Sequence, residues 1–290
     1  MNNVFDFSPS SIAALALADV DRALAEDIGA GDLTAGLINS ERRSHARVLA
    51  REGAVICGVP WAEATLQRLD PKAELIWHVR DGETCEPNQV VLEIKGQSRA
   101  ILSGERTVLN FLQVLSAVAT KTATYVQLVQ SVPGNRAKIV DTRKTLPGLR
   151  LAQKYAVRCG GGSNHRIGLY DAVLIKENHI AAAGGVTAVL QRTAEVAQAA
   201  SFVEIEVETL DQLNEALGAG AKMVLLDNMD LTQLREAVRI TAGRAILEVS
   251  GGVSLDTVAG IAATGVDRIS IGALTKDVKA IDFSMRFQEL

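Results

Sequence analysis

The pattern of apolar and polar positions changes about one third of the way along the chain. Before Gly104, short apolar runs such as residues 44–51, 54–58 and 89–96 predict strands, mixed with helices in no regular order. From Gly104 onward, apolar residues recur every three or four positions, which predicts a long helix. Beyond that helix, predicted strands and helices alternate. The chain therefore predicts an α+β region followed by an α/β region.

The second region contains six apolar runs that predict strands. They cover residues 137–142, 172–177, 203–208, 222–227, 245–250 and 268–273. Strands rich in Val, Ile and Leu, with helical patterns between most of them, are typical of a parallel sheet buried on both faces. Six such units favour a barrel over an open sheet, although spacing alone does not decide whether the barrel closes.

These patterns give a domain prediction. Residues 1–116 are expected to form an N-terminal α/β sandwich domain, and residues 117–276 an α/β barrel that carries the catalytic site. The C-terminal segment 277–290 is a candidate to pack on the first domain.

Composition narrows the class of protein. The chain has 30 Lys and Arg residues against 34 Asp and Glu residues, a net charge of −4, which argues against nucleic acid as the main partner. No apolar run approaches the roughly 20 residues needed to span a membrane. Residues 1–32 predict an amphipathic helix capped near Ser10 or Ser11, not a secretory signal. Three cysteines without metal-ligand spacing predict a reduced, cytoplasmic protein.

Polar residues follow the predicted strands, where the active site of a parallel barrel forms. They include Asp141–Lys144, Lys176–His179, Asp227–Asn228, Ser250–Gly252 and Gly272. Within one strand, Glu204, Glu206 and Glu208 alternate, so they share a face and require partners or neutralisation. The sequence predicts ionisable groups of both signs around one barrel mouth.

Residues 141–170, here called the basic stretch, contain six cations and no acid after Asp141. The cations are Arg143, Lys144, Arg150, Lys154, Arg158 and Arg166. Arg side chains bind carboxylate or phosphate with two parallel hydrogen bonds. Gly251 and Gly252, expected to open a helix, and Gly272 would offer backbone N–H groups to a phosphate. The pattern predicts a ligand with a phosphate at one end, a strongly anionic group at the other, and a polyol or metal-bound middle.

Simpler interpretations exist for several of these residues. Lys154 and Arg158 fit the solvated face of a helix as well as they fit a binding site. His179 fits a helix cap, and Cys159 fits a packed thiol with no chemical role. For the three glutamates, one could simply face solvent.

Longer motifs carry a resemblance to a known family. They are "DTRKTLPGLRLAQKYAVRCGGGSNHRIGLYDAVLIKENH", "EDIGAGDLT", "GERTVLNFLQVLSAVAT", "VEIEVETLDQL", "LLDNM", "EVSGGV" and "ISIGALT". In this order, and over essentially the whole chain, they resemble the quinolinate phosphoribosyltransferase family, also called nicotinate-nucleotide pyrophosphorylase (carboxylating). Residues 116–118, Ser-Ala-Val, depart conservatively from an expected Ser-Gly-Ile.

The resemblance implies a fold and a reaction. The fold is an incomplete α/β (TIM-like) barrel with an N-terminal α+β sandwich domain, like type II phosphoribosyltransferases, working as a homodimer. The reaction converts quinolinate and phosphoribosyl pyrophosphate into nicotinate mononucleotide, pyrophosphate and carbon dioxide. It requires Mg²⁺ and belongs to de novo NAD biosynthesis.

The resemblance also implies roles for individual residues. The quinolinate carboxylates would be bound by Arg143, His165 and Arg166, with the catalytic Lys144 and Lys176 close by. Thr142 would also bind substrate. Arg106 would reach the site from the second copy of the chain. Glu206 and Asp227 would face the ribose hydroxyls and reach Mg²⁺ indirectly, through substrate or water. Phosphate contacts would come from Ser250, Gly251, Gly252 and Gly272.

Three other functions stay open at this point. A lyase or aldolase could use Lys144 or Lys176 to form a Schiff base, because a lysine at a strand end can become nucleophilic when it is desolvated. A barrel of this kind could also bind a phosphorylated ligand without catalysis. A molybdenum-associated paralogue group shares much of the motif set, and the intact Lys176–His179 segment argues against it.

Overall fold

The computed structural model describes residues 5–288, apart from the side chains of residues 194–196, and it divides into two compact units. Among these residues, unit 1 comprises 124–145 and 162–274, and unit 2 comprises 5–123, 146–161 and 275–288. Each unit combines segments that are distant in the sequence. The domain border expected between residues 116 and 117 stays a prediction.

Unit 1 is built on a parallel sheet of six strands. They are β6 (Lys138–Val140), β7 (Val173–Ile175), β8 (Val203–Val207), β9 (Met223–Asp227), β10 (Ile246–Ser250) and β11 (Arg268–Ser270). Their spatial order is β6-β11-β10-β9-β8-β7, with parallel pairing between all neighbours. Within the described residues, β6 and β7 are the two edges of this sheet. The expectation of an incomplete α/β barrel is confirmed.

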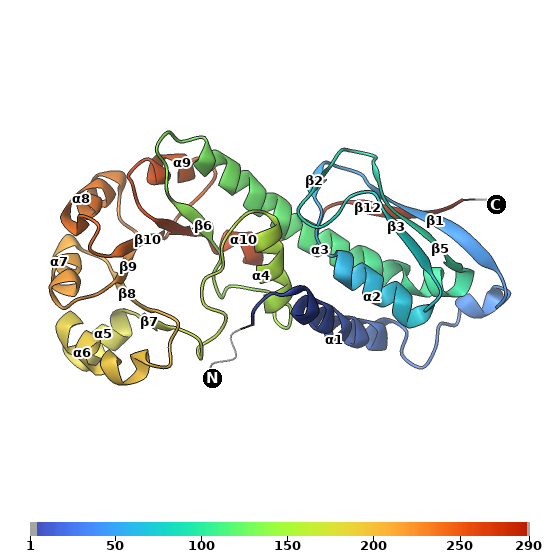
Figure 1. The fold of residues 1–290 in the computed structure, drawn as a ribbon, viewed down its shortest axis with the longest axis horizontal. Helices are drawn as coiled ribbons and strands as arrows, with labels where there is room; N and C mark the ends of the chain where they lie inside the picture. Colours follow the sequence, from blue (N-terminus) through green and yellow to red (C-terminus); the bar gives the residue numbers. More distant parts are fainter. Residues whose placement is uncertain (1–4, 289–290) are drawn as a thin grey trace. The chain divides into compact units, whose positions relative to one another are not determined.

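Helices of unit 1 cover the outer face of the sheet, as Figure 1 shows for α5 to α8. Their bounds are α5 (Glu177–Ala183), α6 (Val186–Ala197), α7 (Leu210–Gly218), α8 (Leu231–Thr241) and α9 (Val258–Ala262). The sequence fixes where α8 begins, because Asp230 accepts hydrogen bonds from the backbone N–H groups of Thr232 and Gln233. Leu234 and Ala237 of α8 are buried, so its apolar face packs inward.

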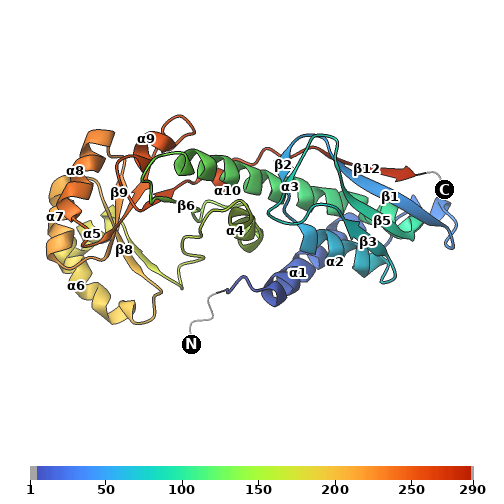
Figure 2. The ribbon, with the colours of Figure 1, turned by 45° about the horizontal axis from the view of Figure 1, so that its top comes forward.

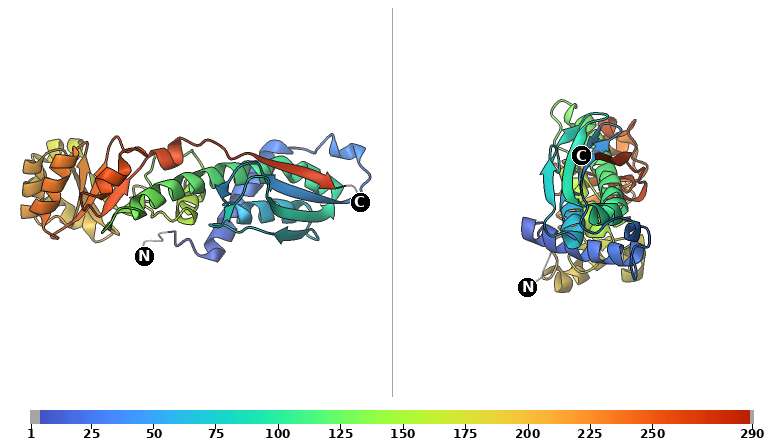
Figure 3. Two further views of the ribbon diagram at one scale, coloured as in Figure 1. Left: turned by 90° about the horizontal axis from the view of Figure 1, so that it is seen from above. Right: turned by 90° about the vertical axis from the view of Figure 1, so that its right-hand side faces the viewer.

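Unit 2 contains an antiparallel sheet in the order β12-β1-β5-β3 and a separate pair of short strands. The strands are β1 (Arg43–Ala50), β3 (Glu74–Trp77), β5 (Val90–Gln97) and β12 (Phe283–Gln288), with β2 (Ala54–Val55) pairing β4 (Thr84–Cys85). Alternate residues of β1 are buried, as expected for a strand with one face on a core. The C-terminal strand β12 pairs with β1, beside which it runs in Figure 3.

The remaining helices are α1 (Pro9–Asp27), the 3₁₀ turn η1 (Ala35–Leu37), α2 (Val59–Leu69), α3 (Ser98–Gln130), α4 (Arg150–Cys159) and α10 (Ala273–Lys276). Within unit 2, α3 lies along the antiparallel sheet (Figure 2), and its Leu109 and Leu112 join Leu92 and Ile94 of β5 in one buried core. The cap of α1 is Ser8, which accepts from the N–H of Ser11. The prediction of Ser10 or Ser11 was wrong, because Pro9 takes the first helical position.

Candidate active site

A cavity of about 330 Å³ lies at the carboxyl ends of the parallel strands of unit 1. It is lined by Thr142, Arg143, Lys144, His165, Arg166, Leu174, Lys176, Glu206, Leu225, Glu248, Ser250 and Ser270. Most of the site residues expected from the sequence are in this list, and the four cations among them share one space. The mouth of the barrel is therefore a basic pocket with carboxylates on its wall.

Five expected residues are outside the lining. Asp227 is the last residue of β9 and pairs in register with Ser250, so it is next to a lining residue. Gly272 approaches the pocket closely, because a Cβ there would lie 2.9 Å from Cδ of Lys144. Arg106 is an exposed residue of α3 in unit 2.

Gly251 and Gly252 are the other two expected residues outside the pocket lining, and they follow β10 directly. Both residues have positive φ, 94° and 59°, and a Cβ on Gly251 would lie 2.1 Å from Oδ1 of Asn228. The prediction that this pair opens a helix was wrong. The turn at Ser254–Thr257 uses its own hydrogen bonds, and α9 begins only at Val258. Both glycines suit the positive φ, and Gly251 is also required by its close packing on Asn228.

Two buried aspartates position the end of the basic stretch. Asp141 accepts hydrogen bonds from the N–H of His165, at 2.9 Å, and from Nδ2 of Asn164, at 2.6 Å. Asp171 accepts from the N–H groups of Ile167 and Gly168, at 2.7 and 2.8 Å. Both ends of the loop are held by charge-assisted hydrogen bonds, which fix the place from which Arg166 reaches the pocket.

The basic stretch does not act as one surface. Lys154 of α4 is completely buried, so the solvated interpretation is wrong for this residue. Arg158 is exposed, as the simpler interpretation expected, and its guanidinium lies 5.1 Å from the ring centre of Phe7. Both belong to unit 2, whereas Arg143, Lys144 and Arg166 line the pocket of unit 1.

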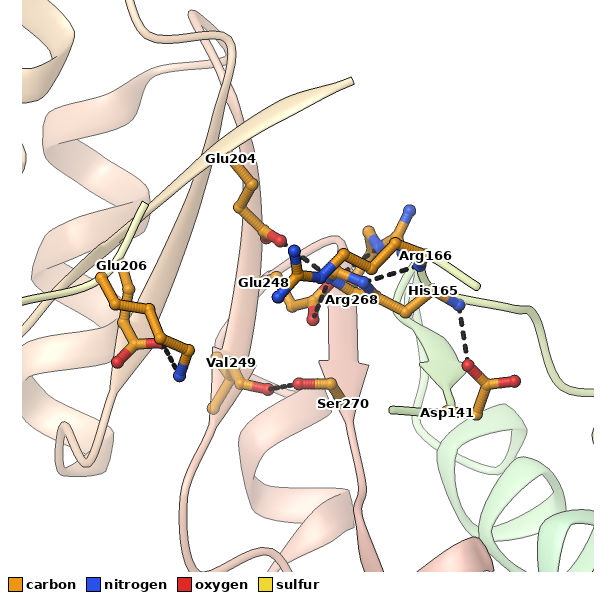
Figure 4. Close-up of polar contacts among 10 residues, drawn as sticks. Asp141, His165, Arg166, Glu204, Glu206, Glu248, Val249, Arg268 and Ser270 are labelled. Carbon is orange, nitrogen blue, oxygen red and sulfur yellow. Dashed lines mark hydrogen bonds and ion pairs between the residues drawn. The ribbon is translucent and has the colours of Figure 1, made fainter. Parts of the chain in front are cut away.

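A buried polar cluster supports the floor of the pocket (Figure 4). His165 Nε2 lies 2.8 Å from Oε2 of Glu204 and 3.5 Å from Oε1 of Glu248, and both glutamates are 0% exposed. Arg268 Nε donates to Oε2 of Glu248 at 2.7 Å. We call His165, Glu204 and Glu248 the histidine–glutamate cluster. Because His165 Nδ1 accepts from the N–H of Arg166, Nε2 carries the proton that is donated to Glu204.

Electrostatics in this cluster reflect its burial. The pKa of Glu204 is raised to about 7, chiefly by burial, with Arg268 lowering it and the charge of Glu206 raising it. Burial likewise raises the pKa of Glu248 to about 7, followed by the charge of Glu204. Burial disfavours the ionised form of both glutamates, and the nearby charge of Arg268 favours it.

The outer rim of the pocket is less buried. Lys176 Nζ lies 3.0 Å from Oε2 of Glu206. The pKa of Asp227 is raised by burial and then by the charge of Glu206, while Lys176 opposes this effect. Glu208 is exposed beyond the end of β8, so the three alternating glutamates pass from a buried to a solvated environment.

His179 has a structural partner. Its Nδ1 accepts the backbone N–H of Lys176 at 2.9 Å, three residues earlier, at the start of α5. This is the helix cap that the simpler interpretation proposed.

Sequence reasoning missed Glu248, Ser270 and Leu225 as pocket residues, and Arg268 beneath them. The signal was present: Glu248 precedes Ser250 by two positions, and Arg268 precedes Ser270 by two, so each pair shares a strand face. Leu174 and Leu225 could not be distinguished from other core residues of their strands. Apolar lining residues carry no polar signal in a sequence.

No helix in the described part of the chain is long and apolar enough to cross a bilayer. Comparison with known proteins gives a consistent answer over the whole chain. Residues 32–116 match the N-terminal domain of quinolinate phosphoribosyl transferase, and residues 118–286 match its C-terminal domain. A relative from Nicotiana tabacum, "Quinolinate phosphoribosyltransferase [decarboxylating] 2b, mitochondrial", is 39% identical over 91% of this chain and 80% of its own length.

Solved structures agree with the sequence comparison. The nicotinate-nucleotide pyrophosphorylase from Francisella tularensis is 43% identical, covering 99% of this chain and 100% of that one, with a TM-score of 0.92. The enzyme of the same name from Ehrlichia chaffeensis is 36% identical, covering 98% of this chain and 100% of that one, with a TM-score of 0.88. This chain therefore belongs to the quinolinate phosphoribosyl transferase family.

Proposed function

We propose that the pocket of unit 1 catalyses the reaction for which this family is named. Quinolinate and phosphoribosyl pyrophosphate give nicotinate mononucleotide, pyrophosphate and carbon dioxide, a step of de novo NAD biosynthesis. The observation that carries this proposal is the convergence of Arg143, Arg166 and Lys176 on one cavity at the strand ends. Two highly anionic substrates require such a concentration of fixed positive charge.

Quinolinate is a dicarboxylate, and the two arginines suit it. The pKa of Arg166 is lowered by burial and then by the charge of Arg143, so the free pocket holds two guanidinium groups that repel each other. A bound dianion relieves this repulsion. Thr142 and Lys144 lie beside Arg143 on the same loop and complete the carboxylate site.

His165 has a different part in this proposal. Its ring nitrogens are engaged with Glu204 and with the N–H of Arg166. We assign to His165 the placing of Arg166, with its ring forming part of the cavity floor. This assignment differs from the direct carboxylate contact that the family resemblance implies.

The sugar donor would lie toward β8, β9 and β10. Its phosphate would contact the Ser250–Gly252 loop and Gly272. Glu206 and Asp227 offer carboxylate oxygens at the ends of neighbouring strands, the ligand type that Mg²⁺ prefers. The charge of Glu206 contributes to the raised pKa of Asp227, and a cation held between the two carboxylates would relieve this repulsion, so the residues fit Mg²⁺ held through substrate or water. When bound, Mg²⁺ supplies positive charge for the departing pyrophosphate.

The residues of this chain then have separate tasks. Lys144 and Lys176 stabilise the negative charge that develops on pyrophosphate as the C1–O bond of the ribose breaks. Glu206 and Asp227 stabilise the positive charge that develops on the ribose ring. The pyridine nitrogen bonds to C1, and the positive charge of the resulting pyridinium stabilises the electron pair left on the adjacent ring carbon when its carboxylate leaves as carbon dioxide. A proton from solvent then bonds to that carbon. Orientation of the two substrates, without a protein nucleophile, supplies most of the rate.

The ion pair of Lys176 with Glu206 argues against a Schiff-base lyase. The Nζ atom of Lys176 lies 3.0 Å from a carboxylate oxygen of Glu206, and this contact would have to be broken before the nitrogen could attack a carbonyl. Lys144 at the pocket rim would face the same anionic substrates. Borohydride trapping with a carbonyl substrate is therefore expected to yield no adduct.

A homodimer is part of the proposal. Arg106 is exposed on α3 and would complete the pocket of a second copy of the chain. Mixing Arg106→Ala chains with Arg143→Ala chains tests this directly. If the two residues serve one site from different copies, the mixture regains part of the activity that each variant lacks alone. A mixture as inactive as its components would contradict the shared site.

The decisive experiment for the function is a product assay. The protein is incubated with quinolinate, phosphoribosyl pyrophosphate and Mg²⁺, and nicotinate mononucleotide is measured together with pyrophosphate. Nicotinate, which lacks one carboxylate, serves as the matched control substrate and should give little product. Equal turnover of both acids, or of neither, would contradict the assignment of the pocket.

A further inference from the structure

Three potential metal ligands meet in unit 2, remote in the sequence from one another. Cys57, Asp81 and Cys159 each offer one ligand atom, and these atoms all lie within 4.8 Å of one another. We call them the thiol cluster. Cys57 follows β2, Asp81 lies before β4, and Cys159 is the last residue of α4. Spacing rules for metal ligands examine only cysteines that are close in the sequence, so they do not detect this cluster.

Each member of the thiol cluster is held by its own contacts. The backbone of Cys57 exchanges two hydrogen bonds with the hydroxyl of Ser116, at 3.0 and 3.1 Å. Beside Cys159, a Cβ on Gly160 would lie 2.3 Å from the carbonyl oxygen of Ala119, so the end of α4 packs tightly on α3. The ligand atoms are therefore positioned before any ligand binds.

Asp81 is oriented in the way that ligating carboxylates usually are. Its Oδ1 accepts the N–H groups of Gly58 and Val59, at 2.9 and 3.0 Å, where α2 begins. Its Oδ2 accepts the hydroxyl of Tyr155 at 2.9 Å. Carboxylates that bind metals are commonly held by such outer hydrogen bonds. Oδ1 thus serves as the anchor, and Oδ2 is the atom available to a cation.

The charge around the thiol cluster is one-sided. Its members are all acids, and the hydrogen bonds that Asp81 accepts come from neutral donors, the N–H groups of Gly58 and Val59 and the hydroxyl of Tyr155. Burial raises the pKa of Asp81 to about 6 and raises that of Cys57 well above its ordinary value.

We propose that Cys57, Cys159 and Asp81 form a structural zinc site. The two thiolates and Oδ2 of Asp81 bind one Zn²⁺, and a water molecule or the phenol oxygen of Tyr155 takes the fourth position. Thiolate and carboxylate are both zinc ligands, and bonds of about 2.0–2.3 Å place tetrahedral ligand atoms roughly 3.5 Å apart. Binding displaces the two thiol protons to solvent. The site would join the end of α4 to the segment between β2 and α2.

Access and charge suit this assignment. Asp81 and Cys159 are partly exposed while Cys57 is fully buried, so the ion would enter past the first two and meet Cys57 last. A dication would neutralise two thiolates and offset part of the desolvation of Asp81. The site is independent of the reaction in unit 1, because none of its residues lines the catalytic pocket.

The test uses Cd²⁺ as a spectroscopic substitute for Zn²⁺. The full-length protein is stripped with a chelator under reducing conditions and titrated with Cd²⁺, following the thiolate-to-metal absorption band. Native mass spectrometry gives the stoichiometry. We expect one metal per chain, and we expect Cys57→Ser and Cys159→Ser to lose the band. Asp81→Asn should weaken binding at least about tenfold, since it removes the anionic ligand.

Cys85→Ser is the matched control, because Cys85 is also a buried free cysteine of unit 2 and lies outside the thiol cluster. This variant should keep the band and the affinity. If Cys57→Ser does not fold, Cys159→Ser and Asp81→Asn still decide the question, with thermal unfolding as a second measurement. Added Zn²⁺ should raise the melting temperature of the wild type and of Cys85→Ser, and leave the ligand variants unchanged.

Three results would overturn the proposal. They are the absence of a band in the wild type, a band that depends on Cys85, and a Cys57–Cys159 disulfide trapped by alkylation in place of metal. None of them touches the proposed catalysis, because nicotinate mononucleotide formation is measured separately on the same samples. Folded thiol-cluster variants should retain it.

Discussion

The two units each contain a trio of potential metal ligands, and the trios differ in what surrounds them. In the histidine–glutamate cluster of unit 1, His165 donates to Glu204 and Arg268 donates to Glu248. In the thiol cluster of unit 2, Asp81 receives only neutral donors. The residue types differ, but the spacing is alike, since each set of ligand atoms falls within 4.8 Å.

The comparison shows that counter-charge distinguishes two uses of a buried acidic cluster. Where cationic or imidazole N–H donors are built in, the acids position them, and in unit 1 the positioned His165 also lines the pocket beside Arg166. Where the donors are neutral, as around Asp81, we propose that a cation from solution supplies the counter-charge. Four experiments test this distinction.

The largest effect is expected from Glu248→Ala. This change removes the carboxylate to which Arg268 Nε donates at 2.7 Å. Breaking a buried ion pair in this way costs about 3–5 kcal/mol of unfolding free energy. Urea denaturation measures the loss. Glu236→Ala is the control, because the ion pair of Glu236 with Arg239 is at the surface and should matter little. Equal, small losses would mean that unit 1 does not depend on internal counter-charge.

Arg143→Ala tests whether the cations that line the pocket of unit 1 bind an anionic substrate. We expect kcat/KM for quinolinate to fall about 10²–10³-fold, roughly 3–4 kcal/mol, because a bidentate partner of a carboxylate is lost. Folding should be unaffected. Arg158→Ala changes an exposed cation of the same basic stretch that lies outside the pocket, and it should leave kcat/KM nearly unchanged. Comparable losses in both variants would refute a specific role for Arg143.

The pH dependence of stability tests the cost of the acids in unit 1. The pKa of Glu248 is raised from 4.5 to about 7, so the folded state binds its proton more tightly than the unfolded state does. Its contribution to stability is therefore present below pH 4.5 and is lost as the pH rises to about 7, by at most about 3 kcal/mol. Urea unfolding between pH 5 and 8 should show this slope in the wild type and a flatter one in Glu248→Gln. Identical slopes would exclude Glu248 as the source.

Some features of the fold and of the site were predictable from the sequence, and others were not. The six parallel strands of unit 1 were predictable, because continuous apolar runs ending in polar residues mark buried parallel strands. The cations of the pocket were predictable because loop glycines and turn residues separate them from a helix pattern. Lys154 was not, since four-residue spacing describes a buried and a solvated helix face equally well.

Contacts between distant segments were out of reach. Nothing local in the sequence places Glu248 beneath His165, or Cys159 beside Cys57, because each meeting depends on the tertiary fold. The cap of α1 and the late start of α9 were missed for a smaller reason. Both depend on which of several Ser and Thr side chains bonds to the backbone, and that choice is made by neighbouring turns.

The smallest expected effect, from Tyr155→Phe, sharpens the comparison on the side of unit 2. The change removes a single neutral hydrogen bond to Oδ2 of Asp81, which should cost about 1 kcal/mol of unfolding free energy. It should also raise the pKa of Asp81 further, because that hydrogen bond lowers it. Tyr170→Phe, at an exposed tyrosine, is the control for urea denaturation.

The same variant identifies the fourth ligand of the proposed zinc site. If Cd²⁺ binds Tyr155→Phe as tightly as the wild type, water fills that position and the phenol only orients Asp81. A loss of tenfold or more would instead make the phenol oxygen a ligand. If Tyr155→Phe without metal were more stable than the wild type, the comparison would be contradicted. Asp81 would then have lost a hydrogen-bond donor, and the protein would have become more stable.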